Sequence, residues 1–348
     1  MEVSLKRRNK TFDLIRVIAI FAIICGHMYT FANFNDVLAT DTSVQFYLSH
    51  FLKAIGLVEN NIFFLITGAY SVSSDYKKAL NKVVSLYIKI YVVSVLCFVF
   101  FTIVWHIPIN IDFLCITFAP FSMNGYWFLS VFITVLLLSP FVNAAWNIIE
   151  RKYALAVYGI FFILIVLIPS ILGEEKVING GEYSVAFGVL LFITGKIIGE
   201  YGEKFKSLKF TGWGYMLLLV VAFLYNTVVK VQFGEIKLID RMMDGSNKLI
   251  PFLLSVLIIS FAMKQTTIFK SAHINRGVSL IAKSSLMIYI VHCNKYFIRF
   301  VFPAIRTLWE KTEIPYIIYV LGVSLLILFL LTALNIMVEW IEARLKKG

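Results

Sequence analysis

Three ionisable side chains lie in the first long hydrophobic stretch of the chain. The stretch 11–33 has the sequence TFDLIRVIAIFAIICGHMYTFAN and contains Asp13, Arg16 and His27. A charge at the centre of a membrane helix costs about 2.5–3.5 kcal/mol on insertion scales, so such residues are the first candidates for function. On a helix Asp13 and Arg16 are neighbours that can neutralise each other, and Arg16 and His27 lie about three turns, roughly 16 Å, apart. The spacing predicts a cation near the start of one helix face and an imidazole further along it.

Structural and chemical roles are both open for these side chains. Arg16 could anchor the helix by reaching toward the lipid headgroups, and His27 could simply be packed and hydrogen-bonded. His27 lies too far into the segment to reach the headgroups, which favours a chemical role. An imidazole titrates near neutral pH and can act as a general base or as a nucleophile. A guanidinium can bind phosphate or carbonyl oxygen, and Asp13 would orient it.

The composition restricts the class of protein. Of 348 residues, 60% are hydrophobic and only 15% are charged, which excludes a soluble globule. The net charge of +12 is explained by basic cytoplasmic loops facing anionic lipids, so we expect no nucleic-acid partner. The four cysteines (Cys25, Cys97, Cys115 and Cys293) lack the spacing of a disulfide framework or a metal motif and are interpreted as packing residues.

Hydropathy predicts an all-α, polytopic membrane protein with about ten transmembrane helices. Their expected positions are near 12–33, 46–70, 83–106, 125–147, 153–172, 183–201, 211–232, 247–263, 278–294 and 314–341. Lys and Arg are about twice as frequent in the loops on the side of the N-terminus, which predicts that both termini are cytoplasmic. We expect one integral-membrane domain over 1–348 with a retained N-terminal segment and no appended soluble domain.

Glu59 is the first of several polar residues within the later apolar segments. It precedes the sequence FFLITG at 63–68 and lies near the expected mid-membrane, where a carboxylate must be paired or protonated. It could be a structural partner of Arg16 or Lys89, or it could be catalytic. Lys82 and Lys89 are seven residues apart, about two turns, and therefore share a helix face. Lys89 lies too far into the membrane for an ordinary loop charge.

Two further segments combine aromatic and polar residues. Tyr126 and Trp127 open the sequence YWFL, and Pro140 follows further along the same apolar segment. By themselves these two aromatic residues fit an interfacial belt. The segment 284–292, SSLMIYIVH, contains Tyr289 and His292, and a solvated histidine at the outer end is the alternative to a functional one.

These motifs, taken in order, resemble the membrane-bound acyltransferase 3 family. The shared features are an Arg and a His separated by ten residues in the first helix, D-L-I-R at its start, FFLITG, W-F-L followed by Pro, and the Tyr and His that end SSLMIYIVH. The family is Arg-rich before the third helix, where this chain has only Lys. Thr67 stands where the family commonly has Ser, and Glu59 is not part of the family pattern.

The resemblance implies an acetyl-CoA-dependent O-acyltransferase of a bacterial plasma membrane. An acyl group would pass from cytoplasmic acyl-CoA to a hydroxyl of a cell-surface polysaccharide or lipid-linked sugar. The expected acyl group is acetyl, and no metal is expected to take part. The expected site residues are His27, Arg16, Asp13 and Glu59 for catalysis, Arg16, Lys82 and Lys89 for the donor, and Trp127, Tyr289 and His292 for the substrate.

A transporter or flippase for a lipid-linked sugar or a small acyl compound is the alternative class, because it also needs buried charges. Such folds often have internal repeats and broken helices in matching places. No repeat is evident in the sequence, and the seven prolines lie mainly near helix ends. A membrane sensor has no specific feature in its favour.

Overall fold

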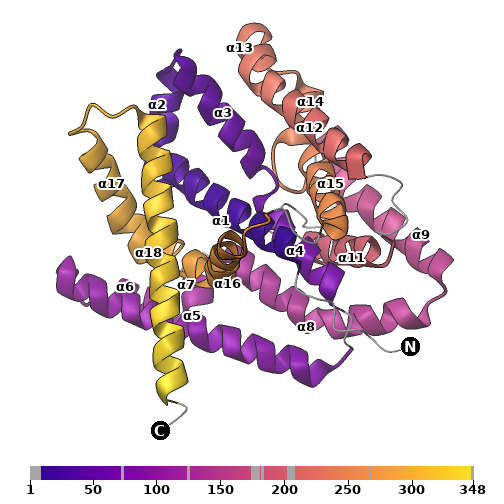
Figure 1. The fold of residues 1–348 in the computed structure, drawn as a ribbon, viewed down its shortest axis with the longest axis horizontal. Helices are drawn as coiled ribbons and strands as arrows, with labels where there is room; N and C mark the ends of the chain where they lie inside the picture. Colours follow the sequence, from indigo (N-terminus) through magenta and orange to yellow (C-terminus); the bar gives the residue numbers. More distant parts are fainter. Residues whose placement is uncertain are drawn as a thin grey trace.

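The protein is a bundle of helices in the computed structural model (Figure 1). The structure describes residues 9–71, 74–123, 126–173, 181, 184–201, 208–265 and 269–345, and every regular element in these residues is helical. The basic residues 1–8 and the segments around residues 179 and 207 lie outside the described part. The all-α prediction is therefore confirmed for the described residues.

The helices follow the apolar segments of the sequence. Their bounds are α1 Lys10–Phe31, α2 Phe34–Thr40, α3 Val44–Gly56, α4 Glu59–Tyr70, α5 Tyr76–Val104, α6 Ile111–Phe118, α7 Pro120–Met123, α8 Trp127–Ile148, α9 Arg151–Phe162, η1 Ile163–Leu167, α10 Ile168–Leu172, α11 Val185–Tyr201, α12 Leu208–Leu224, η4 Tyr225–Val229, α13 Lys230–Phe233, α14 Lys237–Met243, α15 Leu249–Lys264, α16 Ala272–His292, η5 Phe297–Val301, α17 Phe302–Trp309 and α18 Tyr316–Leu345.

Eight stretches are long and apolar enough to cross a membrane. They are Lys10–Phe31, Val44–Tyr70, Tyr76–Val104, Trp127–Ile148, Arg151–Leu172, Thr211–Phe233, Ala272–His292 and Tyr316–Arg344. Each coincides with an expected segment. The other two expected segments form α11 and α15, which have 17 and 16 residues and lie at or below the length that crosses a bilayer. The count of ten and the orientation of the termini remain predictions.

Helix α1 occupies a central position. Its N-cap is Asn9, whose side-chain oxygen accepts from the amide of Thr11 at 2.9 Å and whose side-chain nitrogen donates to the carbonyl of Ala262 on α15 at 2.9 Å. Helices α3, α4, α16 and α18 all pack against α1. Figure 1 shows α16 nearly end-on in the middle of the molecule, with α1 and α18 beside it. The helix with the unusual charges is thus surrounded by other helices.

The second expected span is broken. Helices α3 and α4 are separated by a turn at Leu57 and Val58, and Glu59 is the first residue of α4. The amide groups at a helix N-terminus stabilise a carboxylate there. The break therefore gives Glu59 a favourable place inside an otherwise apolar span.

Helices α4 and α11 touch through glycine. A methyl group added at Gly68 would collide with the carbonyl of Phe192, and one added at Gly195 would collide with the carbonyl of Leu65. Small residues allow membrane helices to approach until their backbones are in contact. The glycine of the FFLITG sequence therefore has a packing role in this chain.

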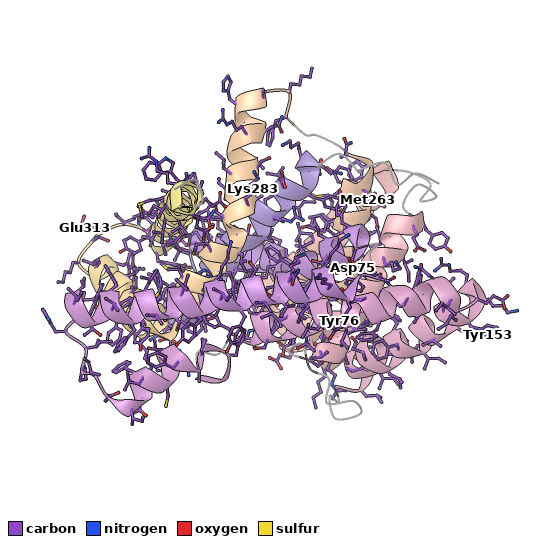
Figure 2. All side chains as sticks on the ribbon, turned by 90° about the horizontal axis from the view of Figure 1, so that it is seen from below. Asp75, Tyr76, Tyr153, Met263, Lys283 and Glu313 are labelled. Atoms are coloured by element: carbon purple, nitrogen blue, oxygen red, sulfur yellow. The ribbon has the colours of Figure 1, made fainter. Side chains whose placement is uncertain are left out.

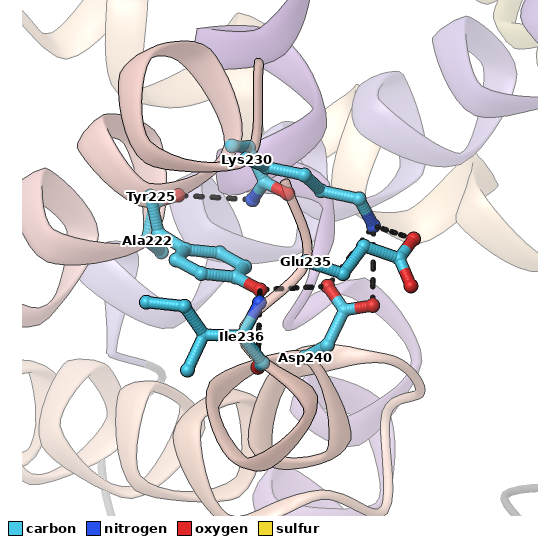
Figure 3. A network of polar contacts seen from close by, with 7 residues as sticks. Ala222, Tyr225, Lys230, Glu235, Ile236 and Asp240 are labelled. Carbon is cyan, nitrogen blue, oxygen red and sulfur yellow. Dashed lines mark hydrogen bonds and ion pairs between the residues drawn. The ribbon is translucent and has the colours of Figure 1, made fainter. Parts of the chain in front are cut away.

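A second polar group, which we call the Lys230 network, joins η4 and α13 to the segment that leads into α14 and to α14 itself (Figure 3). Lys230 Nζ lies 2.9 Å from Asp240 Oδ1 and 3.1 Å from Glu235 Oε1. The hydroxyl of Tyr225 accepts from the amide of Ile236 at 3.1 Å and donates to Asp240 at 3.2 Å. Each polar group of the network therefore finds its partner within the protein.

Candidate active site

Asp13 holds Arg16 at the start of α1. Arg16 Nη1 lies 3.3 Å from Asp13 Oδ1, and the Asp13 side chain is fully buried. The other carboxylate oxygen accepts a hydrogen bond of 2.8 Å from the Ser279 hydroxyl on α16, which itself accepts from Lys10 Nζ at 3.0 Å. Because Asp13 is held from two helices, it can fix the position of the Arg16 guanidinium, which remains partly exposed.

A cavity of about 300 Å³ opens beside Arg16, and we call it the cationic cavity. It brings together Arg16 from α1, Lys82 and Lys89 from α5, and Lys283 and Tyr289 from α16. The rest of its lining is Ile20, Phe63, Ser85, Leu86, Phe128, Leu129, Phe132, Leu136, Ala282, Ser285 and Leu286. Four cations and no carboxylate stand among these lining residues. The arrangement is suited to a polyanion with an apolar portion.

Lys283 is the member of this cavity that sequence reasoning missed. It is a cation within the expected apolar segment 278–294, and it lies well inside α16 (Figure 2). Figure 2 also shows the first turns of α16 projecting beyond the neighbouring helices. Its place within the apolar-periodic segment, like that of Lys89, was the signal that could have found it.

A second cavity, of about 410 Å³, lies further along α1 and is called the histidine cavity. It is lined by His27, Glu59 and Trp127, three of the expected site residues. The remaining lining residues are Ala22, Cys25, Gly26, Tyr29, Thr30, Phe31, Leu52, Lys53, Gly56, Leu57, Asn60, Gly245 and Ser246. Glu59 therefore faces the cavity of His27, whereas Arg16 and Lys89, its two suggested partners, line the cationic cavity.

The two cavities are lined in part by the same helices, α1, α4 and α8. Trp127 lines the histidine cavity, and the next residue, Phe128, lines the cationic cavity. On α1, Ile20 and Ala22 are likewise divided between the two cavities. Both cavities are therefore built on the same helices, and α1 contributes Arg16 to one cavity and His27 to the other.

His27 is accompanied by a second histidine and a thiol. The rings of His27 and His292 are 5.1 Å apart between centroids. Cys293 Sγ lies 3.7 Å from His27 Nδ1 and 3.5 Å from His292 Nε2. His292 is fully buried, so the interpretation as a solvated histidine is wrong. Cys293 is also more than an apolar packing residue, because its sulfur bridges the two imidazoles.

Tyr126 fixes the backbone next to these histidines. Its hydroxyl donates to the carbonyl of Ile290 at 2.7 Å and accepts from the side chain of Asn294 at 2.9 Å. Tyr126 is fully buried, so the interfacial-belt interpretation is wrong for this residue. The start of α8 is thereby tied to the end of α16.

The three residues expected to bind substrate do not share one cavity. Trp127 lines the histidine cavity and Tyr289 lines the cationic cavity. The ring of His292 is buried beside His27, with the Tyr289 ring edge-on to it at 5.9 Å. Of this set, only Trp127 is placed to meet a molecule in the cavity of His27.

Comparison with known families gives the class of the protein. A family model described as an acyltransferase domain (Acyl_transf_3) matches residues 9–336, which extend from the start of α1 into α18. The chain belongs to the acyltransferase 3 family. No curated protein and no solved structure matched the chain in the same comparisons. Membership of the acyltransferase 3 family, together with eight apolar helices of spanning length, makes this protein a multi-pass membrane acyltransferase.

Proposed function

We propose that the protein transfers an acyl group, most simply acetyl, from cytoplasmic acyl-CoA to a hydroxyl of a cell-surface polysaccharide or lipid-linked sugar. The observation that carries this proposal is the pair of cavities along α1, one cationic and one containing His27. A donor held in one and an acceptor held in the other would both lie against α1. Such an arrangement suits a reaction whose two substrates come from opposite sides of a membrane.

The cationic cavity is the proposed donor site. CoA carries several phosphate charges, and Arg16, Lys82, Lys89 and Lys283 supply fixed positive charge around the cavity. The apolar side chains that complete the lining would contact the pantetheine arm. Arg16 can in addition hold a phosphate or the thioester carbonyl in a planar two-point contact that lysine cannot make.

The histidine cavity is the proposed acceptor site. Glu59 and Asn60 provide carboxylate and amide groups that can hydrogen-bond the hydroxyls of a sugar, and Trp127 provides a flat apolar surface beside them. Glu59 is the first residue of α4, and its carboxylate oxygens can accept such hydrogen bonds. This combination favours a neutral, polyhydroxylated acceptor.

His27 is the proposed general base. It would take the proton of the acceptor hydroxyl while that oxygen attacks the carbonyl carbon of the thioester. The carbon–sulfur bond then breaks, and the CoA thiolate takes the proton from His27. Direct attack by His27, with the acyl group carried briefly on the imidazole, is a second route through the same geometry. General-base assistance is worth about 10²–10⁴-fold in rate.

The decisive experiment compares His27→Ala with His273→Ala, an exposed histidine at the start of α16. Inverted membrane vesicles receive labelled acetyl-CoA, and label on polysaccharide or lipid-linked sugar is measured. We expect His27→Ala to lower transfer at least about 100-fold, with normal abundance of the protein, and His273→Ala to leave it unchanged. Undiminished transfer in His27→Ala would remove His27 from the mechanism. Sugar movement without modification would favour the transporter class instead.

A further inference from the structure

The side chains of His27, His292 and Cys293 converge on one point. We call them the His–His–Cys cluster. Their donor atoms, one from each residue, all lie within 4.8 Å of one another. In the part of the chain that the structure describes, this is the one place where three or more such donor side chains converge. The other three cysteines belong to no such group among the described residues.

The spacing of the cluster fits a tetrahedral metal ion. Zinc binds imidazole nitrogen at about 2.0–2.1 Å and thiolate sulfur at about 2.3 Å, so that nitrogen and sulfur ligands of one ion are roughly 3.5 Å apart. The sulfur of Cys293 lies 3.5 Å from His292 Nε2 and 3.7 Å from His27 Nδ1. The two sulfur–nitrogen edges of the tetrahedron are therefore present already. The third edge, between the two imidazole nitrogens, is at most 4.8 Å long.

The second contact of His292 is the one that a metal ligand needs. Its Nδ1 lies at hydrogen-bond distance from the carbonyl of Ile288, one turn earlier in α16. A carbonyl can only accept, so Nδ1 carries the proton and Nε2 presents its lone pair toward Cys293. Metal-binding histidines almost always donate their other N–H in this way, which fixes the ring.

The backbone of the cluster is held in place. The amide of Cys293 donates to the carbonyl of Tyr289, and the Tyr126 hydroxyl holds the carbonyl of Ile290. A preorganised ligand set binds an ion without first having to order the chain. His27 lines the histidine cavity, which provides a path by which an ion could enter.

We propose that His27, His292 and Cys293 form a binding site for a borderline-soft divalent ion of the zinc type. Two imidazoles and one thiolate are a ligand set that such ions prefer. Three protein ligands leave the fourth tetrahedral position for water from the histidine cavity. The thiol loses its proton on binding, so occupancy falls as the pH is lowered.

A metal ion in this site prevents His27 from acting as the general base. A zinc ion on Nδ1 of His27 leaves the proton on Nε2, so that the ring has no free lone pair with which to take a proton from a hydroxyl. Zinc would then inhibit acyl transfer reversibly. This consequence rests on the proposed function of His27, whereas metal binding itself does not.

Binding is tested with Co²⁺, a spectroscopic substitute for zinc, on the purified full chain in detergent after treatment with a chelator. We expect tetrahedral cobalt bands together with a thiolate-to-cobalt charge-transfer band, and displacement of both by zinc. Cys293→Ser should abolish the charge-transfer band, and Cys115→Ser, the matched control on α6, should retain it. Absence of the band from the wild-type protein, or its persistence in Cys293→Ser, would overturn the proposal.

The activity measurement is kept separate from the spectroscopic one. The zinc concentration that halves acyl transfer should rise at least about 100-fold in Cys293→Ser, since loss of a direct ligand exceeds the 10–100-fold effect of losing an outer partner. Cobalt binding without zinc inhibition would show that the metal site exists and that His27 is not the base. If the protein neither binds cobalt nor is inhibited by zinc, the proposed metal site is wrong, and the proposed role of His27 as the base is unaffected.

Discussion

The cationic cavity and the Lys230 network both gather charged side chains, but only in the network is every charge paired with one of opposite sign. In the network Lys230 contacts the carboxylates of Glu235 and Asp240. The Tyr225 hydroxyl hydrogen-bonds to Asp240. The cationic cavity has four cations in its lining and no carboxylate. Asp13, which pairs with Arg16, is not among the lining residues. Within the described residues, no ion pair joins Lys82, Lys89 or Lys283 to an acid.

The difference separates structure from binding. A set of charges that satisfy one another ties helices together and requires nothing from outside, which is the role we assign to the Lys230 network. Cations held near one another repel, and the arrangement is stabilised only when an anion arrives. An unbalanced cluster near hydrocarbon is therefore a stronger sign of a ligand than the number of its charges alone.

The largest expected contrast comes from removing the central cation of each region. Arg16→Met should lower acyl transfer at least about 100-fold, as loss of a positioned charge or donor at a reacting group does. Lys230→Met should leave transfer per folded molecule unchanged. The measurement is the turnover of acetyl-CoA by purified protein, normalised to the folded fraction. Equal losses in the two variants would break the distinction between the two regions.

A smaller effect is expected from the lysines of the cationic cavity. Lys82→Ala together with Lys89→Ala should raise the KM for acetyl-CoA about tenfold, because each partly exposed charge contributes about 0.5–1 kcal/mol. The KM for the acceptor should stay constant, and the difference from wild type should shrink at high salt. Unchanged donor affinity would leave these lysines as anchors of topology.

For the Lys230 network the expected effect is on stability rather than on rate. Asp240→Asn should lower the free energy of unfolding by about 1–2 kcal/mol, because a partly buried lysine loses its closest carboxylate. Lys152→Met, which breaks the more exposed pair with Glu150, is the control and should change it by less than about 0.5 kcal/mol. Thermal unfolding in detergent measures both. A catalytic defect in Asp240→Asn at full folding would contradict a purely structural role.

The last test measures topology, that is, which side of the membrane the starts of α6 and α16 face. The charge bias predicts that a cysteine placed at Asn110, at the start of α6, is labelled from outside and that one placed at Ser271, at the start of α16, is not. The corresponding tests at Asn179 and Ser207 fall outside the described residues. The opposite labelling pattern would put the cationic cavity on the wrong side for a cytoplasmic donor.

Sequence reasoning placed the helices well because membrane insertion depends on the apolar content of each segment, which is a local property. It also expected Arg16, Lys82 and Lys89 to act together on the donor, and the structure places these three around one cavity. The break at Leu57 and Val58 was missed, because both residues are apolar and a turn at a helix end leaves no trace in a hydropathy average.

The contacts between distant helices could not be predicted from segment composition. Lys283 joins the cationic cavity only because α16 lies beside α1 and α5. Cys293 contacts His27 although the two are 266 positions apart in the sequence. The sequence around either residue gives no sign of this contact. Helix neighbours are decided by side-chain packing in three dimensions, which one sequence does not reveal.

The glycine contact between α4 and α11 limits how the sequence can vary. At Gly68 a neighbouring backbone carbonyl occupies the space of a side chain, so every replacement forces two helices apart. The preceding residue is under no such constraint, because the Thr67 hydroxyl bonds only to the Phe63 carbonyl of its own helix, at 2.7 Å, a bond that serine makes equally well. Over evolutionary time position 67 can therefore exchange serine for threonine freely, while position 68 can accept only the residue without a side chain.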